Sequence, residues 1–372
     1  MKEPKIRFQG FTGEWEKKNV QDVCNIISPT YKLQSCDYLK SGKYPIVDQS
    51  QSLVCGWSNS DRGLISDVPV IIFGDHTCIL KYIDFPCIQG ADGVKILLPK
   101  KDYIPTFVYQ SFLSNPVIQD SYKRHFSDLK EKTFSFPPTL AGPVQNLAEQ
   151  QKVASYFQNL DSLIQSTTKK IESLKQVKAA SLQSMFPQEG ETTPRVRFKG
   201  FTGEWEKSTF GELLIFERPD NYIVSNDVYS DEFSTPVLTA NKGFILGYTN
   251  ERRTFNSPCI IFDDFTLDSK FVDFPFMVKS SALKILTLRN EKKDSLYFVY
   301  TLLKQTKIEV LGHARHYISV VQPTQVYMPK DSTEQKMIAS FFSNLDSQIA
   351  LLSQQLEKLQ QIKSACLDNM FV

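Results

Sequence analysis

The sequence contains little of the material from which catalytic and metal sites are usually built. It has only four histidines in 372 residues. It also lacks the patterns GxxxxGKS/T, GxGxxG, HExxH and GxSxG, which bind phosphates or dinucleotides, hold a catalytic zinc ion or carry a nucleophilic serine. We therefore expect a chain with no catalytic activity, cofactor or metal site of its own.

Cysteine usage and the length of the apolar runs limit where such a chain can act. The seven cysteines are scattered and form no CxxC pair, which is typical of reduced thiols and not of disulfides or a zinc site. The apolar runs at 68–73 and 259–262 have the length of strands, and the first ten residues, MKEPKIRFQG, lack the apolar core of a signal peptide. We expect a cytoplasmic protein that is neither exported nor inserted into a membrane.

The net charge is low for a protein that would hold nucleic acid by itself. Its formal value is +2, whereas phosphate contacts dominate the affinity of most nucleic-acid-binding proteins. Any DNA binding is then local to particular loops or shared with partner proteins.

The strongest positive feature is an internal repeat. Residues 4–17, PKIRFQGFTGEWEK, return at 194–207 as PRVRFKGFTGEWEK, and residues 148–186 return at 333–371. Each copy has a nearly invariant opening, a divergent middle of roughly 130 residues and a nearly invariant tail. Segments that stay alike fit the same partner or each other, while segments that differ fit different ligands.

Both tails carry the apolar spacing of a coiled coil. The spacing predicts one helix of about 39 residues in each copy. If a pseudo-twofold axis relates the repeats, the two helices run antiparallel; the alternative is that each seam packs only on its own domain. The seam positions follow alternating steps of four and three, with Thr167 filling the one gap in the first copy: Val153, Phe157, Leu160, Ile164, Ile171 and Leu174, then Ile338, Phe342, Leu345, Ile349, Leu352, Leu356 and Leu359.

The divergent middles have the short, turn-bounded apolar runs of a β-rich domain. The elements FGDHT at 73–77 and KYIDFP at 81–86 correspond to FDDFT at 262–266 and KFVDFP at 270–275. Helices are expected near 106–113 and 296–303. The predicted fold is α+β, with β-rich domains at 1–147 and 194–332, long helices at 148–186 and 333–372, and a linker at 187–193.

Polar and basic side chains concentrate in the loops of the two middles, where they suit hydrogen bonding to base edges. Solvated surface charge is the alternative for each position taken alone. The clusters at 123–125 and 315–316 stand out because they occupy matching places before the last strand of each domain. Lys81 and Lys270 also occupy matching positions. Contact with a DNA phosphate and an ordinary place on the surface are equally consistent with both lysines. The candidate DNA-binding residues are Gln49, Gln51, Asn59, Arg62, Lys81, Lys123, Arg124 and His125 in the first domain, and Asn241, Lys242, Asn250, Arg252, Arg253, Lys270, Arg315 and His316 in the second.

His76 lies outside that set and follows Asp75, so the two could form a metal or acid–base pair. The second copy has Phe265 in the matching place, so the pairing is not repeated. We interpret His76 as part of a turn or a DNA-facing loop, and not as a catalytic group.

Taken together, the repeated FxGFTGEWE opening, the FGDHT and KYIDFP elements and the EQ-rich helix that closes each half resemble the specificity (S) subunit of type I restriction-modification enzymes. The resemblance covers nearly the whole chain. It implies that each domain reads one half of a bipartite, asymmetric DNA site and that the helices set the spacing between the halves. It also implies two methyltransferase (M) subunits that use S-adenosylmethionine, restriction (R) subunits that use ATP, and no catalysis by the S subunit.

Two other classes of function stay open at this point. The chain could be a stand-alone methyltransferase or nuclease, although the missing cofactor and carboxylate motifs count against that. It could also be a coiled-coil adaptor that joins two protein-binding domains without contacting DNA.

Overall fold

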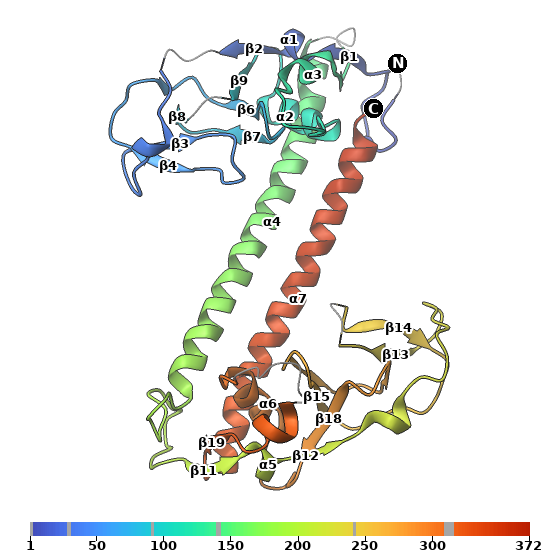
Figure 1. The fold of residues 1–372 in the computed structure, drawn as a ribbon. Helices are drawn as coiled ribbons and strands as arrows, with labels where there is room; N and C mark the ends of the chain where they lie inside the picture. The colour runs from blue at the N-terminus through green and yellow to red at the C-terminus, as the bar shows by residue number, and fades with distance from the viewer. Residues whose placement is uncertain (1–2, 28–30, 91–92, 139–142, 241–242, 309–315) are drawn as a thin grey trace. The chain divides into compact units, whose positions relative to one another are not determined.

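The computed structural model describes residues 3–27, 31–90, 93–138, 143–240, 243–308 and 316–372, and it divides into two compact units (Figure 1). The first unit comprises Met1–Lys169 with Gln354–Val372, and the second comprises Lys170–Ser353. Each unit therefore contains one β-rich domain together with a stretch of each long helix. The combination of two β-rich domains with two long helices confirms the predicted α+β fold class.

Antiparallel pairing dominates the first domain. In its described part, one four-stranded sheet has the order β2-β9-β6-β7, a second has the order β4-β3-β8-β5, and β1 pairs with β10. Among the named strands of the described part of this domain, β3 and β8 form the one parallel pair. The strands are β1 Glu16–Asn19, β2 Cys24–Ile27, β3 Tyr44–Val47, β4 Gly56–Ser58, β5 Leu64–Ile65, β6 Val70–Gly74, β7 Leu80–Ile83, β8 Cys87–Gln89, β9 Val94–Pro99 and β10 Thr133–Phe136, and the helices are α1 Val20–Val23, α2 Pro105–Ser114 and α3 Phe126–Glu131.

The second domain repeats this order of elements with few changes. Its described sheets have the orders β12-β18-β15-β16, β14-β13-β17 and β11-β19. A π-helical turn, Tyr317–Val321, stands where the first domain has α3. The strands are β11 Glu206–Thr209, β12 Leu214–Glu217, β13 Thr235–Leu238, β14 Ile245–Thr249, β15 Cys259–Asp263, β16 Ser269–Val272, β17 Met277–Val278, β18 Leu283–Leu288 and β19 Gln325–Met328, and the helices are α5 Phe210–Leu213 and α6 Leu296–Gln305.

One central strand in each domain is buried on both faces. In β6, Ile71 and Phe73 join one apolar core, while Val70 and Ile72 join another. Strand β15 is divided between two cores in the same way. Such a strand needs a continuous apolar run instead of alternation, which is what VIIF and CIIF provide. The hairpin tip that leaves this strand is therefore carried on the most enclosed part of each domain.

The long helices are α4, Pro143–Met185, and α7, Ser332–Met370. Helix α4 starts ahead of the repeated sequence at 148, so the expected boundary lies inside the helix. The predicted helices near 106–113 and 296–303 are also confirmed, by α2 and α6. Among the described residues, none of these helices combines the length and the apolar character that crossing a membrane requires.

Within each unit the two long helices run antiparallel. In the first unit, the hydroxyl of Tyr156 lies 3.4 Å from Cys366 Sγ, and five residues further along α4 the Asp161 carboxylate pairs with Lys363 at 2.6 Å. As the residue number on α4 increases, the number of its contact on α7 decreases, so the two helices run in opposite directions.

The second unit has the same arrangement, since Lys178 pairs with Asp346 and the Phe186 ring lies 5.8 Å from that of Phe342. The apolar seam is buried at Val153, Phe157 and Leu160 in the first unit and at Ile171 in the second.

The repeated openings are fixed to the helices by the same contacts in both units. Arg7 forms a two-pronged ion pair with Glu149 of α4, and Arg197 forms the same pair with Glu334 of α7. A bidentate arginine–carboxylate pair is both strong and geometrically specific. This shared anchoring gives a physical reason for the near identity of the two openings.

Candidate nucleic-acid interface

Three segments of the first domain converge around His76, which lies in the tip between β6 and β7. Its backbone N–H donates to Gln49 Oε1 at 3.2 Å, and Thr77 Oγ1 donates to the Gln49 carbonyl at 2.8 Å. The His76 ring stacks on Tyr122, with 5.2 Å between ring centroids and 14° between planes, and its Nδ1 lies 3.1 Å from the Lys123 carbonyl. Because a carbonyl only accepts, Nδ1 carries the proton. The segments at 48–53, 74–78 and 115–125 therefore form one continuous surface.

Lys81 holds the first of these segments from beneath. Its ammonium donates to the carbonyls of Asp48, at 2.7 Å, and Ser52, at 2.5 Å, and only 5% of its side chain is exposed. Burial lowers the pKa of this ammonium, while the Asp48 carboxylate opposes the shift. Lys81 thus positions the loop that carries Gln49 and Gln51, and it has no exposed charge to offer a phosphate.

His125 is also interior, although the sequence placed it among the DNA contacts. Its side chain is fully buried, with Nδ1 2.9 Å from Asp128 Oδ2 and Nε2 3.2 Å from the Ser121 carbonyl. Both partners are acceptors, so the geometry suits the doubly protonated ring. The hydrogen bond to Asp128 raises the pKa of His125 above its ordinary value. The ring fastens the segment that ends at Arg124, and does not face solvent.

A buried carboxylate joins that segment to the hairpin tip. Asp75 accepts the backbone N–H of Phe126 at 2.8 Å, and its own carbonyl accepts the N–H of His125 at 2.7 Å. Lys95 lies 3.9 Å from the carboxylate. A carboxylate that accepts a hydrogen bond in this way fixes the start of α3 on the end of β6.

The second domain has the same clamp. Asp264 accepts the N–H of Tyr317 at 2.8 Å, and its carbonyl accepts the His316 N–H at 3.4 Å and lies 3.2 Å from His316 Nδ1. Lys284 lies 3.6 Å from the carboxylate. His316 is buried like His125, so both histidines of the predicted basic clusters occupy interior, positioning places.

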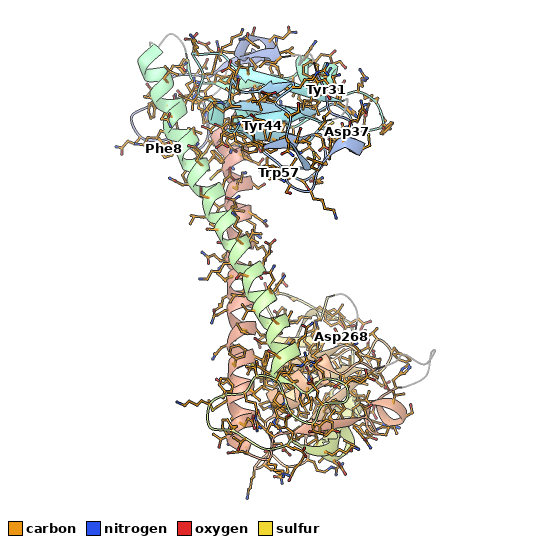
Figure 2. The ribbon with its side chains drawn as sticks, turned by 90° about the vertical axis from the view of Figure 1, so that its left-hand side faces the viewer. Phe8, Tyr31, Asp37, Tyr44, Trp57 and Asp268 are labelled. Atoms are coloured by element: carbon orange, nitrogen blue, oxygen red, sulfur yellow. The ribbon has the colours of Figure 1, made fainter. Side chains whose placement is uncertain are left out.

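The remaining predicted residues of the first domain lie at or near the surface. Gln49 is half-buried, whereas Gln51, Asn59, Arg62, Lys123 and Arg124 are exposed. The Arg62 guanidinium lies 4.3 Å from the Tyr31 ring centroid, a cation–π arrangement that orients it. Tyr31, Tyr44 and Trp57 are labelled in this domain in Figure 2. Lys123 forms ion pairs with Asp120 and Asp128, whereas Arg124 forms none among the described residues.

In the second domain, exposed cations follow β14. Asn250, Arg252 and Arg253 are all exposed, and Glu251 between them accepts the N–H of Ser225 at 2.9 Å. The two domains match here, because Asn59 and Asn250 each follow the last residue of β4 or β14, and Arg62 and Arg253 come three residues later. The predicted residues Asn241, Lys242 and Arg315 lie outside the described part of the chain.

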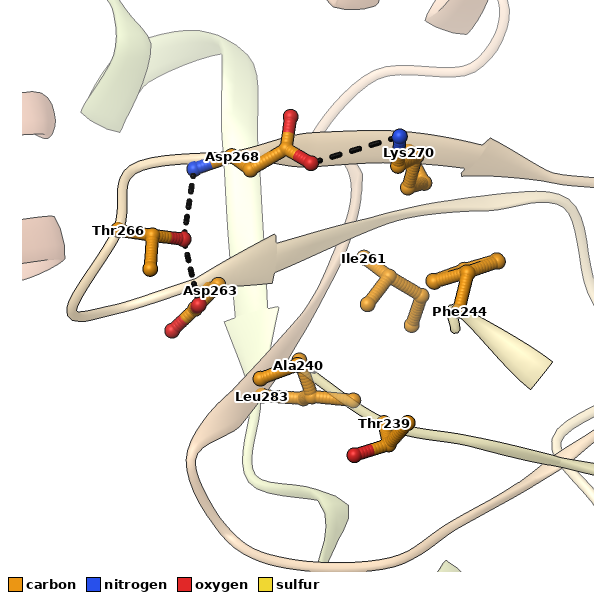
Figure 3. Close-up of a pocket in the computed structure, with 9 residues that line it drawn as sticks. All are labelled: Thr239, Ala240, Phe244, Ile261, Asp263, Thr266, Asp268, Lys270 and Leu283. Carbon is orange, nitrogen blue, oxygen red and sulfur yellow. Dashed lines mark hydrogen bonds and ion pairs between the residues drawn. The ribbon is translucent and has the colours of Figure 1, made fainter. Parts of the chain in front are cut away.

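Lys270 differs from its counterpart Lys81. It is exposed and lies 3.4 Å from Asp268 Oδ2, beside a cavity of about 310 Å³ (Figure 3). Ile261, Phe244 and Leu283 supply apolar lining, and Asp263 and Asp268 supply carboxylates.

In the first domain the matching strand end is Gly74 instead of Asp263, and a Cβ there would lie 2.3 Å from Thr77 Oγ1 and 2.9 Å from the Gln49 Cβ. Gln49 thus packs over the end of β6 in the first domain, where the second domain has the smaller Ala240. The same scaffold presents different surfaces at matched places.

Sequence reasoning did not find the positioning role of the two groups that organise these surfaces: it considered Asp75 only as a partner of His76, and Asp264 not at all. Their signal was present, since the aspartate occupies the same place in FGDHT and FDDFT while the next residue differs. It also passed over Tyr122, an exposed aromatic residue directly before the first basic cluster. No group of three or more histidine, cysteine or acidic side chains in the described ranges could hold a metal ion.

Both halves of the chain match one family model of known proteins. Residues 12–176 and 202–361 each match the family model described as "Type I restriction modification DNA specificity domain". The two matches cover both β-rich domains and most of both helices.

Two individual proteins are similar over different lengths. The specificity subunit of the type I restriction enzyme EcoR124I/EcoR124II from Escherichia coli is 39% identical over 146 residues, which is 38% of this chain and 36% of that protein. The chain thus aligns with about a third of that relative. The crystal structure of a type I restriction-modification S subunit from M. genitalium covers 100% of this chain and 99% of its own, with a TM-score of 0.77 and 15% identity, which shows a shared fold.

Proposed function

The chain belongs to the family of type I restriction modification DNA specificity domains, and we propose that it is the subunit that recognises DNA for a type I restriction-modification complex. Each domain reads one half of a bipartite, asymmetric site in double-stranded DNA. One observation carries this proposal: the two domains share a scaffold and a buried clamp, while the loops held by the clamp differ in sequence.

The exposed polar and basic residues are the contacts we assign to DNA. Arg62 and Arg253, with Asn59 and Asn250, occupy matched places and offer the donors that base edges and phosphates accept. Gln49, Gln51, Lys123, Arg124, Arg252 and Lys270 complete the set on the described surface. His125, His316 and Lys81 act by positioning these loops, because each is buried among internal partners.

The features that repeat without change fit a partner that binds twice. Two methyltransferase subunits would meet the matched openings and helices, and restriction subunits would join that assembly. S-adenosylmethionine and ATP would then be bound by those partners in the cytoplasm. In this division, 1–147 and 194–332 read DNA, and the helical segments at 148–186 and 333–372 set the spacer.

The direct experiment maps modified adenines across the genome with and without this gene. We expect one bipartite motif to lose its modification when the gene is removed. Replacing residues 18–147 with the middle of another such subunit should then change one half of the motif only. Loss of both halves, or methyl transfer by the purified chain without partners, would contradict the proposal.

A further inference from the structure

Two strongly exposed apolar side chains lie in the segment that joins α2 to α3. Ile118 is 81% exposed and Tyr122 is 88% exposed, the highest values among the large apolar side chains of the described residues. Single exposed apolar groups are common on protein surfaces, and these two are distinguished by lying four residues apart on one loop. We call Ile118 and Tyr122 the apolar tip.

The apolar tip is displayed by a rigidly held backbone. The carbonyls on either side of Tyr122 both accept from histidines, Ser121 from His125 Nε2 at 3.2 Å and Lys123 from His76 Nδ1 at 3.1 Å. The Tyr122 ring itself stacks on His76. A side chain that is exposed yet fixed in advance loses little conformational entropy when it binds.

Sequence differences between the repeats point to DNA as the ligand of this tip. The surfaces that both domains share fit a partner that binds both, as argued above. This segment is not shared, because Tyr122-Lys123-Arg124 stands where the second copy has His313-Ala314-Arg315. Arg124 is exposed next to the tip, which suits a phosphate backbone.

We propose that Ile118 and Tyr122 form an apolar wedge that enters a groove of the DNA at the first half-site and presses against a base step. This inference rests on the proposed function and adds a mode of recognition to it. Apolar side chains inserted at a base step unstack it partly and bend the duplex, with basic neighbours held on the flanking phosphates. The wedge therefore selects a step that deforms at low cost, such as TA or CA/TG.

The test uses the full chain assembled with its methyltransferase partners and duplexes that carry 2-aminopurine at successive positions of the first half-site. We expect the complex to raise the fluorescence at one step, which reports local unstacking. Tyr122→Ala should abolish this signal and weaken binding to the specific site by about tenfold, a typical effect of removing an aromatic base contact. Ile118→Ala should reduce both readouts, whereas Tyr122→Phe, which keeps the ring, should change neither.

Val228→Ala is the matched control, because Val228 is 63% exposed in the second domain and should leave the first half-site unaffected. Unchanged fluorescence and affinity in Tyr122→Ala would overturn the wedge. Loss of methyltransferase assembly by Tyr122→Ala in the absence of DNA would overturn it as well, by assigning the tip to a protein partner. If the unsubstituted complex shows no preference for the mapped site, the proposed function fails instead.

Discussion

At the scale of single residues, one aspartate in each domain positions loops that we propose to read DNA. Asp75 and Asp264 connect the hairpin tip of the doubly buried strand to the segment before the last strand of the domain. Both are nearly fully buried. A buried carboxylate is stable only when hydrogen bonds and a cation compensate its lost hydration, and Lys95 and Lys284 provide that cation.

Removing this carboxylate should lower the free energy of unfolding more in the second domain than in the first. The Lys284 side chain is 4% exposed and Lys95 is 33% exposed, so only Asp264→Ala leaves an ammonium unpaired in the interior. We expect the free energy of unfolding to fall by about 3–5 kcal/mol for Asp264→Ala and by about 1–3 kcal/mol for Asp75→Ala. Hydrogen exchange would report each domain separately. The double variant Asp264→Ala/Lys284→Met should recover part of the loss, and equal losses in the two domains would contradict the argument.

His125 should make the first domain less stable as the pH rises. The hydrogen bond to Asp128 raises the pKa of this histidine in the folded state. A raised folded pKa stabilises the fold fully below the unfolded pKa of about 6.5, and that contribution is lost as the pH passes through the folded value. The melting temperature should therefore be lower above neutral pH than below it. His125→Gln, which cannot titrate, should reduce this difference, and identical pH profiles of melting temperature for the two proteins would refute the assignment.

At the scale of secondary-structure elements, the helices join both repeats through a small number of matched contacts. Asp161 with Lys363 in the first unit and Asp346 with Lys178 in the second are the same pair from the two copies. The apolar seam repeats every seven residues. Inserting a whole heptad therefore keeps the seam contacts, whereas inserting part of a heptad does not.

Inserting one heptad into each helix should therefore lengthen the spacer between the two half-sites. Seven residues after Lys169 and seven after Ser353 add about 10 Å, or roughly three base pairs, and keep the seam in register. Sequencing the modified sites would show unchanged half-sites with a longer gap. Insertion into one helix only is the control, since it shifts Lys178 away from Asp346 and should abolish activity. An active double insertion with the original gap would exclude the helices as the ruler.

These elements also mark how far the sequence alone could lead. The repeat, the two long helices and the short helices near 106–113 and 296–303 follow from local periodicity, which needs no knowledge of distant contacts. Burial of single polar residues does not follow in this way. His125 is interior because Asp75, some fifty residues earlier, holds its backbone, and Lys81 is interior while the matching Lys270 is exposed. Those differences depend on which loop closes over which strand, as Gln49 does over Gly74.

At the scale of the whole molecule, the two ends of the chain correspond to the junction between the repeats. The Ile6 N–H donates to the Asn369 carbonyl at 2.9 Å within the first unit, and the Val196 N–H donates to the Ser184 carbonyl at 2.8 Å within the second. An opening segment thus docks on the end of a long helix in both places, although only one of the two is covalently continuous. We call this arrangement a closed repeat, because the chain could start at either docking contact and keep the other.

Circular permutation should therefore preserve recognition. Joining Val372 to Met1 with a short flexible linker and opening the chain within 187–193 keeps both docking contacts, and exposed junctions tolerate such breaks.

By the same reasoning, residues 194–372 alone should dimerise through their own seam and, with methyltransferase partners, modify a palindrome of the second half-site, because twofold symmetry in the protein demands it in the DNA. Mapping the modified adenines for both variants is the measurement. A permuted chain that folds and assembles with its partners yet modifies no site would show that recognition depends on the original connectivity, and the closed repeat would lose its functional meaning.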